Sequence, residues 1–118
     1  MIDVVHFYKV DNLDNVRAFY EKVLGLSLYK DQGKCLIYDL NGFGKIGFCT
    51  HHPKGKSETS CITFVFSSRG AVDAMHKTLS ETLETNIKKP TFNETFGIYH
   101  FFVHDYEGLL LEFQVFEK

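Results

Sequence analysis

The sequence predicts an α+β fold made of two copies of one βαβββ module. Two segments show the spacing of apolar residues that is typical of helices. Each of these segments follows one short strand-like segment and precedes several others. The order of predicted strands and helix in residues 4–50 is therefore repeated in residues 60–116. A half of this length buries little apolar surface by itself, and we therefore expect the two copies to share a core.

Both copies open and close with a short strand. The opening strands are residues 4–8 (VVHFY) and 61–66 (CITFVF), and the closing strands are residues 45–49 (KIGFC) and 109–113 (LLLEF). These segments are rich in aromatic and β-branched residues, and Gly, Asn and Asp bound them, as is typical of strands. Residues 105–108 (DYEG) predict a tight hairpin before the last closing strand.

Each copy has one predicted helix, at residues 13–24 and near residues 71–83. Apolar side chains recur there every three or four positions, which gives each helix one apolar face. Short polar residues precede both segments, and Gly or Asn follows them, as expected at helix ends. The expected caps are Asp11 or Asn12 for the first helix and Ser67 or Ser68 for the second, with Gly25 and Asn86 at their ends.

The two copies are joined by residues 51–59, which are polar and show no periodicity. We therefore expect residues 1–118 to form a single domain, with module 1 at residues 1–50 and module 2 at residues 60–118. Strand residues 101–103 and 109–111 are apolar at every position, which predicts strands that are covered on both faces. The resulting prediction is a curved mixed β-sheet that forms a cup, with the helices outside.

Composition excludes several classes of function. The formal net charge of −2 is spread along the chain, which argues against a nucleic-acid partner. No apolar run approaches the roughly 20 residues of a membrane span, and Met1 leads directly into a strand, so we expect neither a membrane partner nor a signal peptide. Three cysteines without CxxC spacing predict no disulfide framework and a cytoplasmic location. Exposed sheet edges favour a homodimer.

These motifs resemble the vicinal oxygen chelate superfamily, which includes glyoxalase I, bleomycin-resistance proteins, fosfomycin-resistance thiol transferases and extradiol dioxygenases. The matching pieces are His6 on the opening strand, the helix exit at residues 19–26 (FYEKVLGL), and residues 105–112 (DYEGLLLE). The resemblance covers essentially the whole chain. It predicts the fold strongly but no single reaction, because one fold hosts many activities.

The resemblance implies a divalent metal such as Zn, Ni, Mn or Fe, held by a His on each opening strand and a carboxylate on each closing strand. His6 and Glu112 match two of these positions. The other two differ: the first closing strand has Gly47 or Phe48 in place of the carboxylate, and the second opening strand offers Cys61, or Thr63 in a shifted register. The implied metal ligands are therefore His6 and Glu112, with Cys61 as a weak third.

Several further residues are candidates for a site. Glu112 lies in an apolar strand, so its carboxylate must be paired, metal-bound, protonated or in a wet cavity, and in the last case it is a candidate proton acceptor in catalysis. His100 and His104 share a strand face and form a second candidate metal pair. Aromatic residues could line a ligand pocket or pack in the core. The candidate substrate-binding residues are Tyr8, Tyr38, Phe48, Tyr99 and His100.

Two functions therefore remain open. The first is a metal-assisted lyase, isomerase or transferase of the glyoxalase type, which acts on a small substrate with two adjacent oxygens. The second is a metal-free protein of the bleomycin-resistance type, which sequesters a small molecule in an aromatic cup. His6 and Glu112 favour the enzyme, and the missing carboxylate at Gly47 or Phe48 favours the binding protein.

Overall fold

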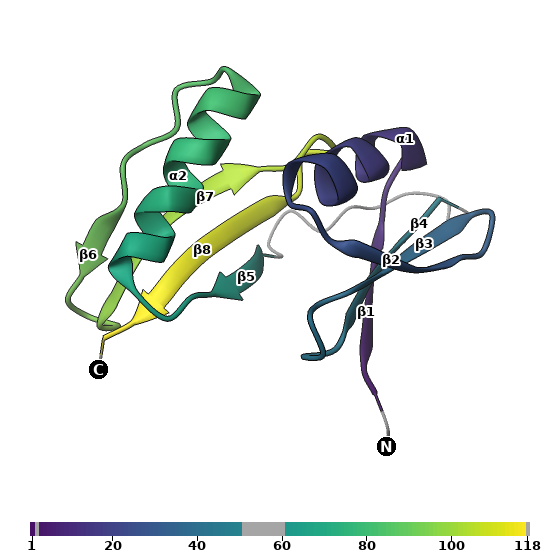
Figure 1. Cartoon of the computed structure of the whole chain (residues 1–118), viewed down its shortest axis with the longest axis horizontal. Coiled ribbons are helices and arrows are strands. Elements are labelled where there is room, and N and C mark those ends of the chain that lie inside the picture. The colour runs from purple at the N-terminus through teal and green to yellow at the C-terminus, as the bar shows by residue number, and fades with distance from the viewer. Residues whose placement is uncertain (2, 51–60, 118) are drawn as a thin grey trace. The chain divides into compact units, whose positions relative to one another are not determined.

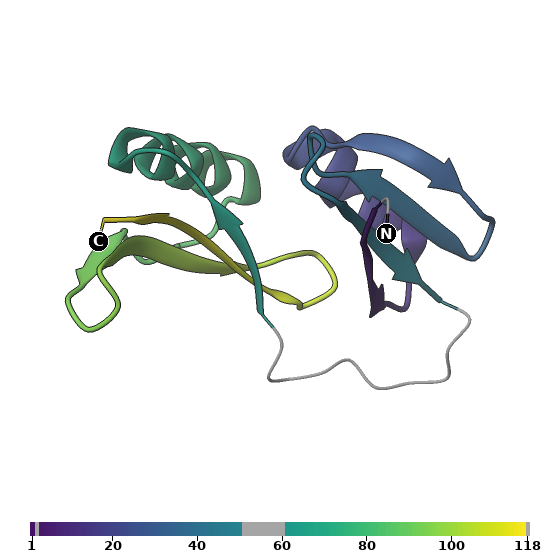
Figure 2. The same ribbon diagram turned by 90° about the horizontal axis from the view of Figure 1, so that it is seen from below.

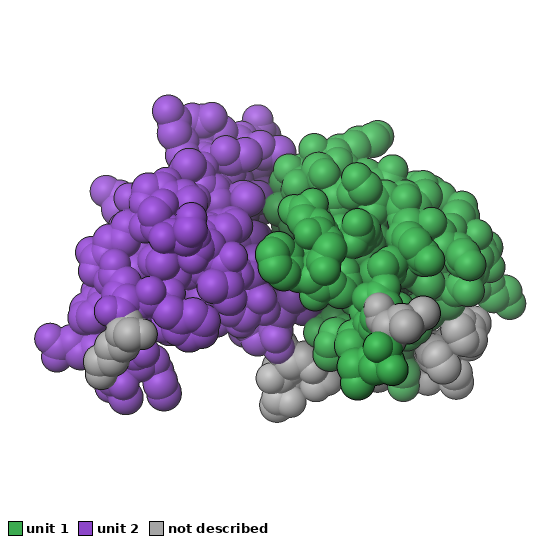
Figure 3. Space-filling model, turned by 60° about the horizontal axis from the view of Figure 1, so that its bottom comes forward, with its two compact units in different colours: residues 1–58 green, residues 59–118 purple. Residues whose placement is uncertain are grey.

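The computed structural model describes residues 1, 3–50 and 61–117. Figure 1 shows it as a ribbon coloured from the N-terminus to the C-terminus. The chain divides into two compact units, Met1–Glu58 and Thr59–Lys118, which Figure 3 colours separately. Each unit has the order strand, helix, three strands. The two predicted βαβββ modules are therefore confirmed.

Unit 1 has a four-stranded mixed sheet in the order β1-β4-β3-β2. The first and last strands of the module, β1 and β4, pair in parallel, and the other neighbours pair antiparallel. The predicted helix is present as an α-helix that continues into a π-helix. The elements are β1 (Val5–Lys9), α1 (Leu13–Val16), η1 (Arg17–Val23), β2 (Ser27–Asp31), β3 (Cys35–Asp39) and β4 (Lys45–Cys49).

Unit 2 repeats this topology in the order β5-β8-β7-β6. Its opening and closing strands, β5 and β8, again pair in parallel, and β7 pairs antiparallel with both of its neighbours. The predicted second helix is present and begins two residues earlier than expected. The elements are β5 (Cys61–Val65), α2 (Arg69–Leu83), β6 (Thr91–Asn93), β7 (Ile98–His104) and β8 (Leu110–Phe116).

In each unit the helix covers one face of the sheet, as Figure 2 shows for both. The core of unit 1 lies between its helix and its sheet, where the ring of Tyr20 from η1 is 4.4 Å from the ring of Phe48 in β4. In unit 2, α2 packs on β7 and β8, and its Val72 and Leu79 are fully buried. The opposite face of each sheet carries the alternate residues of every strand.

The helix and hairpin signals in the sequence act as predicted. Asn12 caps α1 by accepting a hydrogen bond from the backbone of Asp14, and Ser68 caps α2 through the backbone of Ala71. The second helix ends at Leu83, before the predicted Asn86, because Glu84 takes a left-handed conformation with φ of 50°. Residues 105–108 form the predicted turn between β7 and β8.

The hydrogen bonds of the described strands form one sheet in each unit, whereas the sequence predicted one curved sheet for the whole chain. The predicted linker, residues 51–59, lies outside the described residues. The organisation of both modules as one domain stays a prediction. Within the described part of the chain, no helix is both long and apolar enough to cross a membrane.

The spacing of the cysteines predicted that the chain has no disulfide framework, and this prediction was wrong for one pair. Cys35 and Cys49 are direct partners in the register of β3 and β4 and form a disulfide, whereas Cys61 is free and exposed. The spacing of 14 residues looks unremarkable in sequence. The pairing arises because the two strands are antiparallel neighbours, which places both side chains opposite one another on one face.

Candidate functional site

The opening and closing strands meet at equivalent positions in the two units. In unit 2 the third residue of β5, Thr63, pairs with the third residue of β8, Glu112. In unit 1 the third residue of β1, Phe7, pairs with the third residue of β4, Gly47. A polar pair between the opening and closing strands of one sheet therefore corresponds to an apolar pair at the same place in the other.

Polar side chains gather on the face of the unit 2 sheet that is opposite α2, which we call the polar face. Residues that pair across β5, β8 and β7 point to the same side of the sheet. Phe101 and Phe113, which alternate with these residues, stack on each other at 5.3 Å, and Phe101 contacts His76 of α2, so they mark the helix face. The polar face carries Cys61, Thr63, His100, Phe102, Glu112 and Gln114.

Glu112 is the centre of this face, and its side chain is only 12% exposed. Its Oε1 accepts a hydrogen bond from the hydroxyl of Thr63 at 2.8 Å. Its Oε2 lies 2.6 Å from Nδ1 of His100, whose side chain is 13% exposed. The apolar strand thus holds its carboxylate by pairing it, which is one of the outcomes expected from the sequence.

Gln114 adds donors to the same carboxylate. This side chain is 4% exposed and belongs to β8, two residues beyond Glu112. Carboxylate oxygens only accept hydrogen bonds, so the amide turns its nitrogen toward Glu112, where it lies 3.2 Å from both oxygens. The carboxylate of Glu112 is therefore surrounded by donors from three neighbouring strand positions.

The hydrogen bond to Glu112 orients the imidazole of His100. An ionised carboxylate accepts, so Nδ1 carries the proton, and Nε2 of the neutral ring is left as an acceptor. Within the described residues Nε2 makes no hydrogen bond. The ring of Phe102, which is 46% exposed, meets the imidazole edge to face at 5.1 Å.

Cys61 lies on the same face, at the start of β5. Burial raises the pKa of its thiol; a hydrogen bond with Thr63 lowers it, and the charge of Glu112 raises it further. The group is therefore a protonated thiol at neutral pH. Nucleophilic attack needs the thiolate, so this environment does not activate Cys61 as a nucleophile.

In unit 1 an aromatic ring occupies the place that corresponds to the carboxylate. A Cβ atom on Gly47 would lie 2.5 Å from Cδ1 and Cε1 of Phe7, so the phenyl ring rests directly on the glycine. Gly47 is buried, whereas Phe7 is 53% exposed. A carboxylate at position 47 would require this ring to move away.

His6 lies on the other face of the unit 1 sheet. It pairs with Ile46, which is 2% exposed and shares the helix face with Phe48. The imidazole of His6 is itself exposed. Glu112, in contrast, lies on the face of its own sheet that is opposite the helix. In the part of the chain that the structure describes, no group of three or more His, Cys, Asp or Glu side chains is placed to hold a metal.

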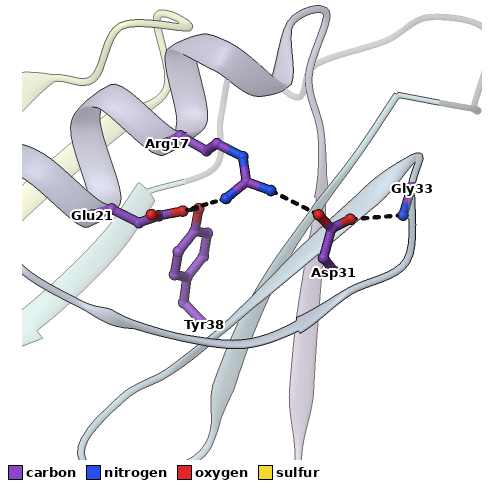
Figure 4. Close-up of polar contacts among 5 residues, drawn as sticks. All are labelled: Arg17, Glu21, Asp31, Gly33 and Tyr38. Atoms are coloured by element: carbon purple, nitrogen blue, oxygen red, sulfur yellow. Dashed lines mark hydrogen bonds and ion pairs between the residues drawn. The ribbon is translucent and has the colours of Figure 1, made fainter.

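Two of the residues predicted to bind substrate lie in the core of unit 1 instead. Tyr38 and Phe48 are both 0% exposed, because β3 and β4 turn these side chains toward the helix. Figure 4 shows what the hydroxyl of Tyr38 does there: it donates to Oε2 of Glu21 at 2.7 Å. Arg17 donates to the same oxygen of Glu21 at 2.9 Å and, through its other terminal nitrogen, to Asp31 of β2 at 2.7 Å. These contacts connect the helix to β2 and β3.

The other two tyrosines predicted to bind substrate are partly buried. Tyr8 lies on the helix face of unit 1, with its ring 6.2 Å from that of Phe48. The hydroxyl of Tyr99 donates to Asp73 of α2 at 2.6 Å, and the guanidinium of Arg69 lies 4.4 Å from its ring centre. Among the predicted substrate-binding residues, His100 is thus the one that lies beside Glu112.

Three residues of the polar face were not predicted as site residues from the sequence. Thr63 was considered only as an alternative to Cys61 as a metal ligand, and Phe102 and Gln114 were not proposed. The pattern Glu112, Phe113, Gln114, with two polar residues two positions apart in an apolar strand, was the available signal. A period of two places both polar side chains on the same face of a strand.

Comparison with solved structures shows which fold this is. The chain superposes on a lactoylglutathione lyase from Agrobacterium tumefaciens with a TM-score of 0.76 at 19% identity, covering 95% of this chain and 91% of the other. A possible glyoxalase from Bacillus cereus gives 0.76 at 22% identity, covering 96% and 97%. A glyoxalase/bleomycin resistance protein/dioxygenase from Nocardioides gives 0.79 at 12% identity, covering 100% and 84%.

At these identities the likeness establishes the fold. The chain has the βαβββ fold of glyoxalase/bleomycin resistance protein/dioxygenase structures, and the predicted resemblance is confirmed at that level. No protein-family profile matches the sequence. No curated protein matches it either.

Proposed function

We propose that this chain is a metal-free protein that binds a small aromatic molecule on the polar face of unit 2. The observation that carries the proposal is the contrast between the central strand pairs of the two units. Thr63 and Glu112 form a polar pair in unit 2, whereas the ring of Phe7 rests on Gly47 at the equivalent position in unit 1. Phe7 and Gly47 offer no metal ligand.

The donor set around Glu112 agrees with this proposal. Thr63 and His100 both act as donors toward Oε1 and Oε2 of Glu112, and a Thr hydroxyl is not one of the usual protein ligands of these metals. The amide of Gln114 is a further donor to both oxygens. The residues at these positions therefore do not fit a site with three protein ligands, and no metal-dependent step follows from them.

The chemistry of the polar face defines the ligand. The exposed ring of Phe102 offers an aromatic surface, and Nε2 of His100 offers a hydrogen-bond acceptor beside it. A small aromatic molecule that carries a hydroxyl or amine group fits both. Several solved structures with this fold bear the composite name glyoxalase/bleomycin resistance protein/dioxygenase, and a bleomycin-resistance-type protein is the second of the two functions that the sequence left open.

The test is thermal unfolding of the full chain in the presence of EDTA. Metal-free bleomycin and a panel of small aromatic amines and phenols are the probes. A ligand that binds only the folded state at a hundred times its Kd stabilises that state by about 2.7 kcal/mol, which raises the Tm. Phe102→Ala should abolish the rise, whereas Phe96→Ala, which removes another exposed ring, should keep it. No rise with any probe would contradict the proposal.

A metal-assisted enzyme is the alternative, and one observation favours it. Glu112 and His100 place a carboxylate and an imidazole, both suitable ligands, within 2.6 Å of each other. This alternative predicts uptake of about one Zn, Ni, Mn or Fe ion by the purified chain, lost in Glu112→Gln and in His100→Gln. Metal analysis after incubation with each ion decides between the two functions.

A further inference from the structure

We propose that His100 acts as a general base, with Glu112 as the residue that positions it. The inference goes beyond ligand binding and rests on the proposed function in one respect, namely that Glu112 is not a metal ligand. The two side chains come from neighbouring strands, β7 and β8, and share the polar face. Their contact of 2.6 Å between Nδ1 and Oε2 is a short, charge-assisted hydrogen bond.

The contact with Glu112 determines which nitrogen of His100 can react. A carboxylate that accepts from Nδ1 holds the neutral ring in the form that leaves the lone pair on Nε2. The same carboxylate stabilises the imidazolium that forms when Nε2 takes a proton. Geometry of this kind, with a base oriented by a third group, is what proton transfer requires.

Thr63 and Gln114 hold the carboxylate in place. Thr63 donates to Oε1 at 2.8 Å, and the 4% exposed amide of Gln114 lies 3.2 Å from both oxygens. These donors lie on strands that pair directly with each other, so the carboxylate has little freedom to rotate away from His100. A base whose partner is fixed by such a second layer of contacts is pre-organised for proton transfer at Nε2.

Phe102 defines the class of substrate. Its ring is 46% exposed and meets the imidazole at 5.1 Å, so an aromatic molecule stacked on Phe102 brings its edge to His100. The substrate class that we propose is therefore a small aromatic molecule that presents its acidic group, an activated C–H, at the edge of its ring. The proton moves to Nε2, the electron pair of the C–H bond stays on the substrate, and return of the proton to another substrate atom restores the neutral base.

The first test uses 5-nitrobenzisoxazole, an aromatic carbon acid that reports on general bases. The base removes the ring C–H proton, the electron pair forms the carbon–nitrogen triple bond of a nitrile, and the nitrogen–oxygen bond breaks to release a coloured phenolate. With EDTA present, the full chain should accelerate this reaction relative to free imidazole. His100→Gln should reduce the rate by about tenfold or more.

The matched control is His104→Gln, because His104 is an exposed histidine on the same face of β7. It should leave the rate unchanged. A rate for the wild-type chain that does not exceed that of free imidazole, or equal rates in His100→Gln and the wild type, would overturn the proposal.

The second test reads the position of the proton by long-range proton–nitrogen NMR correlation of the histidine rings. The neutral ring of His100 should carry its proton on Nδ1, and Glu112→Gln, which keeps an acceptor oxygen, should retain this form. Glu112→Leu should convert it to the Nε2–H form, and a purely structural role for Glu112 would not. A proton on Nε2 in the wild-type chain would overturn the proposal.

These outcomes separate the two proposals. Uptake of metal would defeat the proposed function, whereas the proton on Nε2 would defeat only the general base. Ligand-induced stabilisation with no turnover would leave a binding protein without this activity.

Discussion

The ring of Phe7 rests on the backbone of Gly47, so that a side chain at position 47 would begin 2.5 Å from two of the ring carbons. This contact joins the central residues of β1 and β4, the two strands that pair in parallel in unit 1. The equivalent contact in unit 2 joins Thr63 and Glu112. One topology therefore supports an apolar contact in one unit and a polar one in the other.

The contact predicts that Gly47→Ala is unfavourable only while Phe7 is present. The added methyl group must displace the ring, which should lower the free energy of unfolding by about 1 kcal/mol, since Phe7 is half-exposed and can move. In a Phe7→Ala background the same change should be neutral or stabilise by about 0.5 kcal/mol, because alanine restricts the unfolded chain. Urea unfolding of the four proteins measures the coupling. Equal effects in both backgrounds would show that the ring does not rest on the glycine.

The disulfide between Cys35 and Cys49 should stabilise unit 1. It closes a loop with a sequence separation of 14 residues, for which restriction of the unfolded chain is worth about 3 kcal/mol. Treatment with a phosphine reductant should therefore lower the Tm. The double variant Cys35→Ala, Cys49→Ala should show no response to the reductant, and Cys61→Ala should respond like the wild type. A Tm that reductant does not change in the wild-type chain would argue against the bond.

The module order was predictable because it depends on local patterns. Helical spacing between short apolar strands is visible in one sequence, and the caps at Asn12 and Ser68 act as their residue types suggest. What the sequence did not show is the face of the sheet on which a strand residue lies. The first strand is apolar at Val5, Phe7 and Tyr8, on both parities, so the sequence did not show on which face His6 lies.

Strand register also explains the other differences. Cys35 and Cys49 meet only because β3 and β4 align with one another, and Phe48 is buried because it shares a face with Ile46. The pairing of Glu112 with His100 requires β7 beside β8 in one specific register. Such long-range pairing is set by the packing of the whole sheet, which a local pattern does not contain.

The hydrogen bond from Tyr38 to Glu21 should contribute to the stability of unit 1. Tyr38→Phe keeps the buried ring but removes the hydroxyl that donates at 2.7 Å, while Arg17 still pairs with the carboxylate (Figure 4). The free energy of unfolding should fall by about 1 to 2 kcal/mol, measured by urea unfolding at neutral pH. Tyr29→Phe is the control, because Tyr29 is 58% exposed. An equal loss in both variants would contradict a specific role for the bond.

The same tyrosine should make stability depend on pH in alkaline solution. Burial, followed by the hydrogen bond with Glu21, raises the pKa of Tyr38 above its usual value. The folded state therefore retains this proton more tightly than the unfolded state, so its contribution is complete below a pH of about 10 and is lost as the pH rises further. The difference in stability between the wild type and Tyr38→Phe should shrink over that alkaline range. A difference that stays constant would contradict the raised pKa.

The thiol of Cys61 reports on the charge of Glu112. Burial raises its pKa, and the nearby carboxylate of Glu112 raises it further, so less thiolate is present at a given pH than for an ordinary cysteine. Iodoacetamide should therefore modify Cys61 more slowly than a cysteine in an unfolded peptide at mildly alkaline pH, as followed by mass spectrometry. Glu112→Gln should speed the reaction because it removes the negative charge, and Glu81→Gln, on the exposed side of α2, should not. If both variants react at the wild-type rate, the carboxylate of Glu112 does not act on the thiol.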